Sequence, residues 1–310
     1  MLKTLQILAA SFRLAWQELR NNKLRTFLSL FGVTIGIFCI IGVLTTVDSL
    51  ERNIKEGINS LGSNTIYIDK WDYSGGGDGD YPWWKYVKRP SPKYDEMRFI
   101  RAKTDAIENM AFTLQVQGQN IIHEKDMIQN VALYGVTEEF NAIQPFEIQY
   151  GRYLTLSDME RGSANGVMGY ENAAKLFGSA ERALGKTITI KNKKINVVGV
   201  IKKQGKSLLV SGWNFDDCVI LSYRFFRTIF EERYSNPTIM VQGKPNVTTE
   251  AFKDELRGTL RAVHRLSPGT EDDFSLNAVS DFSEAVTSLF SNVKLGGWLI
   301  GLLSLVVGAF

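Results

Sequence analysis

The chain has 310 residues, of which 44% are hydrophobic and 22% are charged, and its formal net charge at pH 7 is +3. This composition excludes a disordered chain, and so small a charge argues against a nucleic-acid partner. The two cysteines, Cys39 and Cys218, lie in segments of different kinds, so we expect the protein to fold without a disulfide.

The N-terminal region is predicted to associate with a membrane. Residues 1–25 have apolar side chains at helical spacing, which favours an amphipathic helix on the cytoplasmic membrane surface. Residues 26–47 contain no charged side chain, and as a helix this run is long enough to cross a bilayer core of about 30 Å. A cleaved signal peptide is the alternative, although the apolar region of such a peptide is shorter, about 7–15 residues. Five basic residues against one acid in the first 25 residues predict a cytoplasmic N-terminus and an extracytoplasmic domain after the helix.

Gly32 and Gly36 form a step of two small residues, four positions apart, in this first membrane helix. In lipid, close backbone approach through small residues promotes helix packing. Both glycines are therefore candidate packing positions, either between protomers or against a later helix of the same chain. The alternative is that glycine is simply frequent in membrane helices.

Helical patterns continue beyond the membrane. Residues 48–62 and 281–295 each carry apolar residues three and four positions apart, which predicts a short packing seam on each of two stalk helices. A second apolar run, residues 296–310, is predicted to begin a second membrane helix, and a buried globular helix is the alternative. The candidate seam residues are Leu50, Ile54, Leu61, Val286, Leu289 and Val293.

Residues 63–280 are predicted to form a large domain outside the membrane, and the fold class is α+β. Two βαβ-like stretches, 63–118 and 237–280, are expected to build one α/β lobe. Alternating Val and Ile residues between them predict a β-rich lobe over about 119–236. Helix starts are expected at Ser91-Pro92, at Thr248-Thr249 and at Asp281.

A dense group of aromatic residues surrounds a Gly-rich stretch that begins at residue 74. Within this group, Trp83 and Trp84 form a candidate partner surface, because exposed aromatic side chains are enriched at interfaces. The alternative is a loop whose aromatic residues fold back onto their own domain.

The sequence contains no defensible site for catalysis, a metal or a nucleotide. Residues 205–207 (Gly-Lys-Ser) resemble the end of a P-loop, but the first glycine of that motif is missing. His123 and His264 are far apart and have no cysteine partners, which argues against a metal site. Adjacent acids such as Asp272 and Asp273 are expected to be solvated. We therefore expect a protein that is not an enzyme and holds no cofactor itself.

Five segments, in order, resemble the permeases of MacB-like and FtsX-like ABC transporters. The first segment, NNKLRTFLSLFGVTIGI (21–37), resembles the family's basic R-T start of a membrane helix, and the second, INSLGSNTIYI (58–68), resembles its L-G-x-N exit into the first outer strand. The third, GRYLTLSD (151–158), resembles its G-R-x segment. The fourth, VMGYENAAKLFG…ALGKTITIKNKKINVVGVIKKQG (167–205), resembles the strands and the A-x-x-L-F-G helix of the MacB-type periplasmic core, and the fifth, FDDCVILSYRFF (215–226), resembles the segment that follows.

The resemblance implies a permease subunit with four transmembrane helices, of which this sequence contains the first and the start of the second. It implies that ATP is bound by a separate cytoplasmic ATPase subunit and that a second permease protomer is present. In MacB-type proteins it further implies a periplasmic adaptor and an outer-membrane channel. ATP cycling would move the stalk as a lever and export substrate from the periplasm or the membrane. The implied location is the cell inner membrane, with several membrane passes.

Two other functions are left open by the sequence. An FtsX-like protein would regulate cell-wall hydrolases and would not export a substrate. A receptor or sensor with two membrane helices would also place an extracytoplasmic ligand domain between them.

Overall fold

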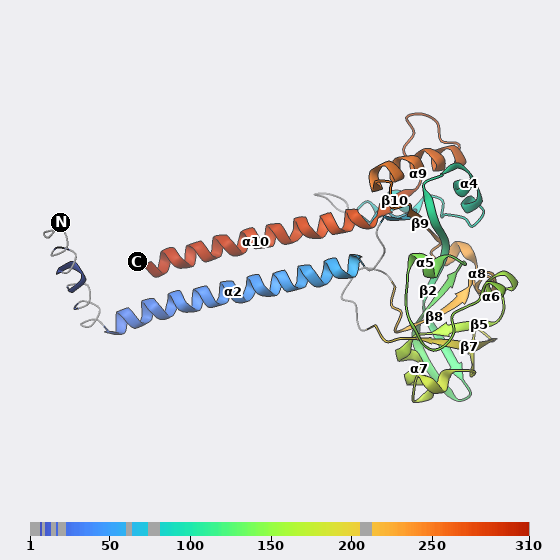
Figure 1. Cartoon of the computed structure of the whole chain (residues 1–310), viewed down its shortest axis with the longest axis horizontal. Helices are drawn as coiled ribbons and strands as arrows, with labels where there is room; N and C mark the ends of the chain where they lie inside the picture. Colours follow the sequence, from blue (N-terminus) through green and yellow to red (C-terminus); the bar gives the residue numbers. More distant parts are fainter. Residues whose placement is uncertain are drawn as a thin grey trace. The chain divides into compact units, whose positions relative to one another are not determined.

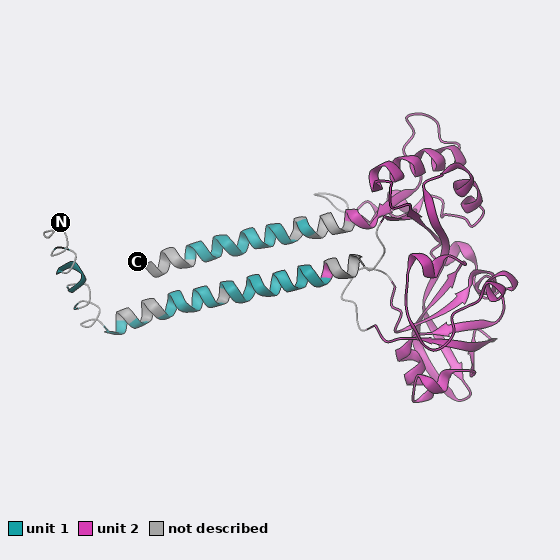
Figure 2. Ribbon diagram, viewed as in Figure 1, with its two compact units in different colours: residues 1–53, 286–310 teal, residues 54–285 magenta. Residues whose placement is uncertain are grey.

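The computed structural model describes residues 7, 10–13, 17, 23–59, 64–73, 81–204 and 213–309. The chain forms two compact units, residues 1–53 with 286–310 and residues 54–285, which Figure 2 colours separately. The first unit is helical, and the second carries every strand found in the described residues.

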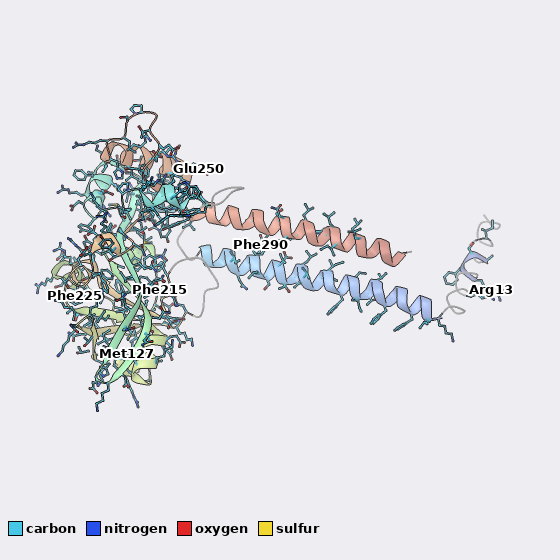
Figure 3. All side chains as sticks on the ribbon, turned by 180° about the vertical axis from the view of Figure 1, so that it is seen from behind. Arg13, Met127, Phe215, Phe225, Glu250 and Phe290 are labelled. Carbon is cyan, nitrogen blue, oxygen red and sulfur yellow. The ribbon has the colours of Figure 1, made fainter. Side chains whose placement is uncertain are left out.

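The helical unit contains most of two long helices, α2 (Lys23–Asn59) and α10 (Val279–Ala309), which lie side by side (Figure 1). Apolar side chains project from both helices (Figure 3): Phe38 is 76% exposed and Trp298 is 68% exposed. Such faces are stable in lipid rather than in water. Within the described residues one segment, Phe31–Ile54, is long and apolar enough to cross a membrane, with a mean hydropathy of 2.0.

This segment overlaps the predicted membrane run 26–47. In the predicted amphipathic helix, residues 7, 10–13, 17 and 23–25 are helical, and the remaining positions lie outside the described residues. The P-loop-like residues 205–207 also lie outside them.

The second unit, residues 54–285, is called the outer unit from here on. It is built on one ten-stranded sheet, whose order begins β10-β1-β9-β2. These strands come from the two ends of the domain, and each neighbouring pair is antiparallel. Each βαβ stretch therefore places one of its strands between the two strands of the other, which is the split βαβ arrangement. The helices of the two stretches pack together, and the hydroxyls of Thr104 and Thr259 are 3.0 Å apart. The bounds are β1 Thr65–Asp69, α4 Glu96–Lys103, β2 Ile107–His123, β9 Thr238–Gly243, α9 Thr249–Val263 and β10 Ser275–Ala278.

The middle of the chain closes part of this sheet into a ring. From β2 the order continues β3-β8-β5-β7-β4, and β6 pairs with both β7 and β2. Ile122 of β2 lies opposite Thr189 of β6, which returns the path to its start. Closure of this kind protects strand edges. The bounds are β3 Asp126–Val136, β4 Ile148–Gly151, β5 Asn165–Met168, β6 Thr187–Ile190, β7 Lys193–Ile201 and β8 Cys218–Ser222.

Short helices connect these strands, and their ends follow ordinary capping chemistry. At the start of α6 the Thr155 hydroxyl accepts a hydrogen bond from the Asp158 amide, and the Asp158 carboxylate accepts one from the Thr155 amide. The helix α7 ends at Gly178, whose φ of 77° is the left-handed conformation that favours glycine. The bounds are α3 Trp83–Val87, α5 Phe140–Ile143, α6 Leu156–Arg161, α7 Tyr170–Phe177, η1 Glu181–Ala183, α8 Tyr223–Phe226 and η2 Glu232–Tyr234.

Of the three helix starts that the sequence predicts, the one at Thr248 is confirmed, because its hydroxyl accepts a hydrogen bond from the Ala251 amide and caps α9. The start at Ser91-Pro92 is wrong. Pro92 is buried, and α4 begins four residues later, at Glu96. The start at Asp281 is also wrong: α10 begins at Val279, directly after β10.

The long hairpin of β2 and β3 crosses the predicted boundary between the two lobes. β2 is one strand of 17 residues, and its register against β3 shifts between Val116 and Gln119. The expected lobe boundary at residues 118–119 falls at this irregularity, inside a continuous strand. One cluster of buried apolar residues extends from β1 to β8 across it.

Candidate functional sites

The helices α2 and α10 approach each other closely at two glycines of α10. A Cβ atom placed on Gly301 would lie 2.8 Å from Cδ1 of Ile40, and one placed on Gly297 would lie 3.3 Å from Cδ2 of Leu44. A side chain at the first of these positions would force the end of the Ile40 side chain to move. The contact is therefore of the small-residue type that packs helices in lipid.

One turn towards the outer unit, a cluster of charges joins the same two helices. Nζ of Lys294 on α10 lies 2.7 Å from Oδ1 of Asp48 and 2.6 Å from Oε2 of Glu51, both on α2. The side chain of Glu51 is 13% exposed, that of Lys294 is 35% exposed and that of Asp48 is 63% exposed. Asp48 is the first charged residue after the apolar run, so this ion pair marks the outer end of the predicted membrane segment.

The structure does not test the predicted packing glycines. Among the described residues, no atom lies within 4 Å of a Cβ placed on Gly32. Gly36 is partly exposed. Their packing between protomers or against a later helix stays a prediction. Sequence reasoning missed Gly297 and Gly301, which are themselves a G-x-x-x-G step in the second apolar run.

The predicted stalk seam has an incomplete structural description. Leu50 is 39% exposed, Val293 is 52% exposed and Ile54 is partly exposed. Val286 and Leu289 belong to α10, and nothing is described of their side chains; Leu61 lies outside the described residues. The seam therefore stays a prediction.

The two long helices continue into neighbouring strands of the outer unit. β1 follows α2 and pairs antiparallel with β10, which runs directly into α10. Ile66 lies opposite Ala278 at the end nearer the helices, and Asp69 lies opposite Ser275 at the other end. In the first turn of α10, Asp281 pairs with Lys253 of α9 at 2.7 Å.

Asn64, which ends the L-G-x-N segment, fixes the start of β1. Its backbone is left-handed, with φ of 59°, a conformation that asparagine tolerates. Its Nδ2 donates to the carbonyls of Lys244 (3.2 Å) and Val247 (3.1 Å), and its Oδ1 accepts from the Thr249 hydroxyl (3.1 Å). Its carbonyl accepts from the Gly243 amide at 2.9 Å. One side chain thus holds the end of β9 and the start of α9 against β1.

The aromatic group near α3 divides into two sets. Trp71, Tyr81 and Tyr86 fold together, with ring centroids 6.5 Å apart for Trp71–Tyr86 and 5.3 Å apart for Tyr81–Tyr86. Trp83 and Trp84, in contrast, are 60% and 54% exposed. They are placed on the surface, as a partner contact would require, although the structure contains no partner that would test the prediction.

His264 ties α9 to two other segments. Nδ1 lies 2.7 Å from the carboxylate of Asp273, and Nε2 lies 3.7 Å from that of Glu96 on α4. The carboxylates of Glu96 and Asp273 raise the pKa of His264 to about 9. Asp272 pairs with Arg261 at 2.5 Å. The expectation that Asp272 and Asp273 are simply solvated is therefore wrong, because basic side chains of α9 face this loop.

The sequence matches the family described as the MacB-like periplasmic core domain over residues 26–259. The macrolide export ATP-binding/permease protein MacB of Neisseria gonorrhoeae is 28% identical over 302 residues, which cover 96% of this chain and 43% of that protein. The pyoverdine export ATP-binding/permease protein PvdT of Pseudomonas syringae is 25% identical over 96% of this chain and 42% of that protein. The chain thus spans less than half the length of these curated relatives.

Two solved structures resemble the fold. The periplasmic region of MacB from Actinobacillus actinomycetemcomitans aligns with a TM-score of 0.58 at 18% identity, over 75% of this chain and 96% of that one. The extracellular domain of the ABC-type transporter YknZ from Gram-positive bacteria aligns with a TM-score of 0.52 at 17% identity, over 68% of this chain and 98% of that one. At these identities the similarity concerns the fold alone.

Proposed function

Because the chain belongs to the family of the MacB-like periplasmic core domain, we propose that it is part of the permease of an ATP-driven exporter. The observation that carries this proposal is the extent of the family match, which begins in the apolar part of α2 and continues through the outer domain. The relatives reported above are named as export ATP-binding/permease proteins. An FtsX-like regulator or a two-helix sensor is less well supported.

The proposed mechanism is mechanical transmission. A movement that ATP hydrolysis imposes on α2 and α10 would reach the outer domain through β1 and β10, because each helix is adjacent in sequence to one of these paired strands. Lys294 and the glycine contacts join the helices, so a displacement of one would carry the other with it. Substrate would be moved on the extracytoplasmic side.

The partners and membrane arrangement belong to the same proposal. We propose a cytoplasmic ABC ATPase, a second permease protomer, a periplasmic adaptor and an outer-membrane channel. We also propose several passes of the inner membrane with a cytoplasmic N-terminus. The division of the outer domain into two lobes is supported by its two topologies, the split βαβ set and the strand ring.

Gene deletion tests the exporter proposal. A strain that lacks the gene should accumulate a radiolabelled macrolide, lipopeptide or siderophore from a test panel, and the intact gene should restore efflux. A gene copy that lacks residues 64–278 should not restore it. Unchanged accumulation of every compound, combined with altered cell-wall hydrolase activity, would favour the regulator instead. A phosphatase that is active only outside the cytoplasm, fused at Gly162, tests the orientation.

A further inference from the structure

A basic groove lies beside the exposed tryptophans of α3. It has a volume of about 930 Å³ and lies between the chain that follows α3, residues 87–93, and η2 with Pro237. Its walls include Tyr234, which is 73% exposed, and prolines from both segments. Five basic residues and one acid line it: Lys70, Lys88, Arg89, Lys93, Arg233 and Glu232.

The groove is more basic than the domain that contains it. Residues 64–285 contain 28 Lys and Arg against 29 Asp and Glu, so the outer domain as a whole is close to neutral. The single acid is already engaged: Glu232 accepts a hydrogen bond from the Tyr223 hydroxyl at 2.7 Å and lies 3.5 Å from Nε of Arg227. Lys88, Lys93 and Arg233 are exposed, and no ion pair is found for them in the described residues.

A neighbouring cavity differs from the groove in its balance of charged side chains. It has a volume of about 350 Å³ and contains Lys85 and Lys253, but each of these pairs with an acid of the same cavity. Lys85 lies 2.6 Å from Glu271, and Lys253 lies 2.7 Å from Asp281. That cavity is charge-balanced, whereas among the described residues the basic groove has a single carboxylate, that of Glu232.

Arg89 gives the groove a fixed cation. Nη1 of Arg89 lies 2.7 Å from the Ser275 hydroxyl, 3.2 Å from the Phe274 carbonyl and 3.3 Å from the Lys70 carbonyl. The guanidinium also stacks over the Tyr86 ring at 4.6 Å. These partners are uncharged and hold the side chain at the border of the groove and the neighbouring cavity, both of which Arg89 lines; a preorganised group costs less ordering entropy when a ligand binds.

An apolar strip continues the groove along α3. Trp83, Trp84 and Val87 are spaced four and three residues apart, so they lie on one side of the helix, and each is at least half exposed. Val87 also lines the groove. Tryptophan, tyrosine and arginine are the residues most enriched at the energetic centres of protein interfaces.

We propose that the groove and the α3 strip together bind an extended acidic segment of a partner protein. Carboxylates of that segment would meet Lys88, Lys93 and Arg233, and its apolar side chains would pack on Trp83 and Trp84. A small free anion would meet the basic side chains alone and would leave the apolar strip without a role. The inference goes beyond the proposed export function and would hold for a regulator as well.

Fluorescence anisotropy tests the proposal on the full chain in non-ionic detergent. The probe is a fluorescein-labelled peptide of alternating glutamate and leucine, and a glutamate–glycine peptide reports the apolar contribution. The variant Lys88→Glu with Lys93→Glu reverses two charges in the groove. Lys193→Glu with Lys194→Glu is the matched control, because both lysines are exposed on β7 and neither lines the groove. Trp84→Ala tests the strip.

We expect the groove variant to bind the probe about tenfold more weakly, since each exposed charge contact is worth ~0.2–1 kcal/mol and four unit charges are changed in sum. The control variant should bind as the wild type does, and Trp84→Ala should weaken the leucine probe but not the glycine probe. Equal weakening by the two charge variants would overturn the proposal, as would no binding by the wild type. Binding of phosphatidylglycerol vesicles with the same Lys88 and Lys93 dependence, without peptide binding, would assign the groove to lipid. Arg233→Glu repeats the test if the double variant does not fold.

Discussion

Replacing Lys294 with methionine should loosen the contact between α2 and α10. The substitution keeps an unbranched side chain of similar length but removes the cation that lies 2.6 Å from Glu51 and 2.7 Å from Asp48. Two carboxylates would then lie close together without the cation that lies between them. The glutamate side chain is 13% exposed, so water replaces the lost partner poorly there.

The free-energy cost of Lys294→Met follows from how exposed the three side chains of the ion pair are. An exposed ion pair contributes ~0.2–1 kcal/mol, whereas breaking a buried pair costs ~3–5 kcal/mol. Asp48 belongs to the first class, and Glu51 with the 35% exposed Lys294 lies between the two. We expect a cost of about 1–2 kcal/mol, which lowers the ratio of joined to separated helices about 5–30-fold.

Distances between spin labels measure this effect. Labels at Val43→Cys and Leu299→Cys, both exposed positions, report the separation of the helices in a background without Cys39 and Cys218. Lys294→Met should lengthen and broaden the distance distribution, and Lys294→Arg should preserve it.

The double variant Lys294→Met with Glu51→Gln should recover part of the wild-type distribution, because it also removes one of the two negative charges that Lys294 faces. A Lys294→Met distribution identical to that of the wild type would refute the assignment of Lys294 as a contact that holds the two helices together.

Three further predictions concern other contacts. Gly301→Leu should increase the distance between the same two labels, because a Cβ there would lie 2.8 Å from Ile40. Gly32→Leu should leave the distance between the labels unchanged. The reverse pattern would disprove the assignment of Gly301 as a contact between α2 and α10. Asn64→Ala should lower the free energy of unfolding of the outer unit by ~2–3 kcal/mol, since it removes three side-chain hydrogen bonds and places alanine at positive φ. Asn64→Gly should restore about 1 kcal/mol of this loss, because glycine tolerates positive φ. Chemical denaturation followed by circular dichroism measures both changes. Protonated His264 should stabilise the outer unit, because Glu96 and Asp273 stabilise its charge. This stabilisation should be complete below about pH 6.5 and should disappear as the pH rises through about 9, where His264 loses its proton. A melting temperature of His264→Gln that falls over this pH range as steeply as that of the wild type would contradict the prediction.

Local structure in the outer domain could be predicted from the sequence where a single segment contains the signal. Alternating Val and Ile residues predicted the β-rich region in which β6 and β7 lie. The start of α4 was wrong: Ser91-Pro92 is good helix-start chemistry, yet Pro92 is buried, Tyr94 and Asp95 form a turn, and the first helical residue is Glu96. Capping preferences are local, and tertiary packing overrides them.

The contacts that matter most for the candidate sites join residues that are distant in sequence. The ring closes through Ile122 and Thr189, Lys294 reaches Glu51 across 243 positions, and Asn64 reaches Val247 across 183. No periodicity within one segment reveals such partners. A G-x-x-x-G step shows that a helix face permits close packing, but it does not say which helix packs there. The sequence therefore indicated Gly32 and Gly36, while α10 approaches α2 through Gly297 and Gly301.

The junction between helices and strands limits how the proposed transmission can work. On the proposed mechanism, a slide of α2 along α10 that reached β1 would disturb its pairing with β10, in which four residues of each strand face each other. Each backbone hydrogen bond lost there would cost about 0.5–1.5 kcal/mol, in addition to the Lys294 ion pair. A joint movement of both helices would break neither contact. We therefore expect that, if the transmission operates as proposed, the helix pair moves as one body and the paired strands β1 and β10 move together.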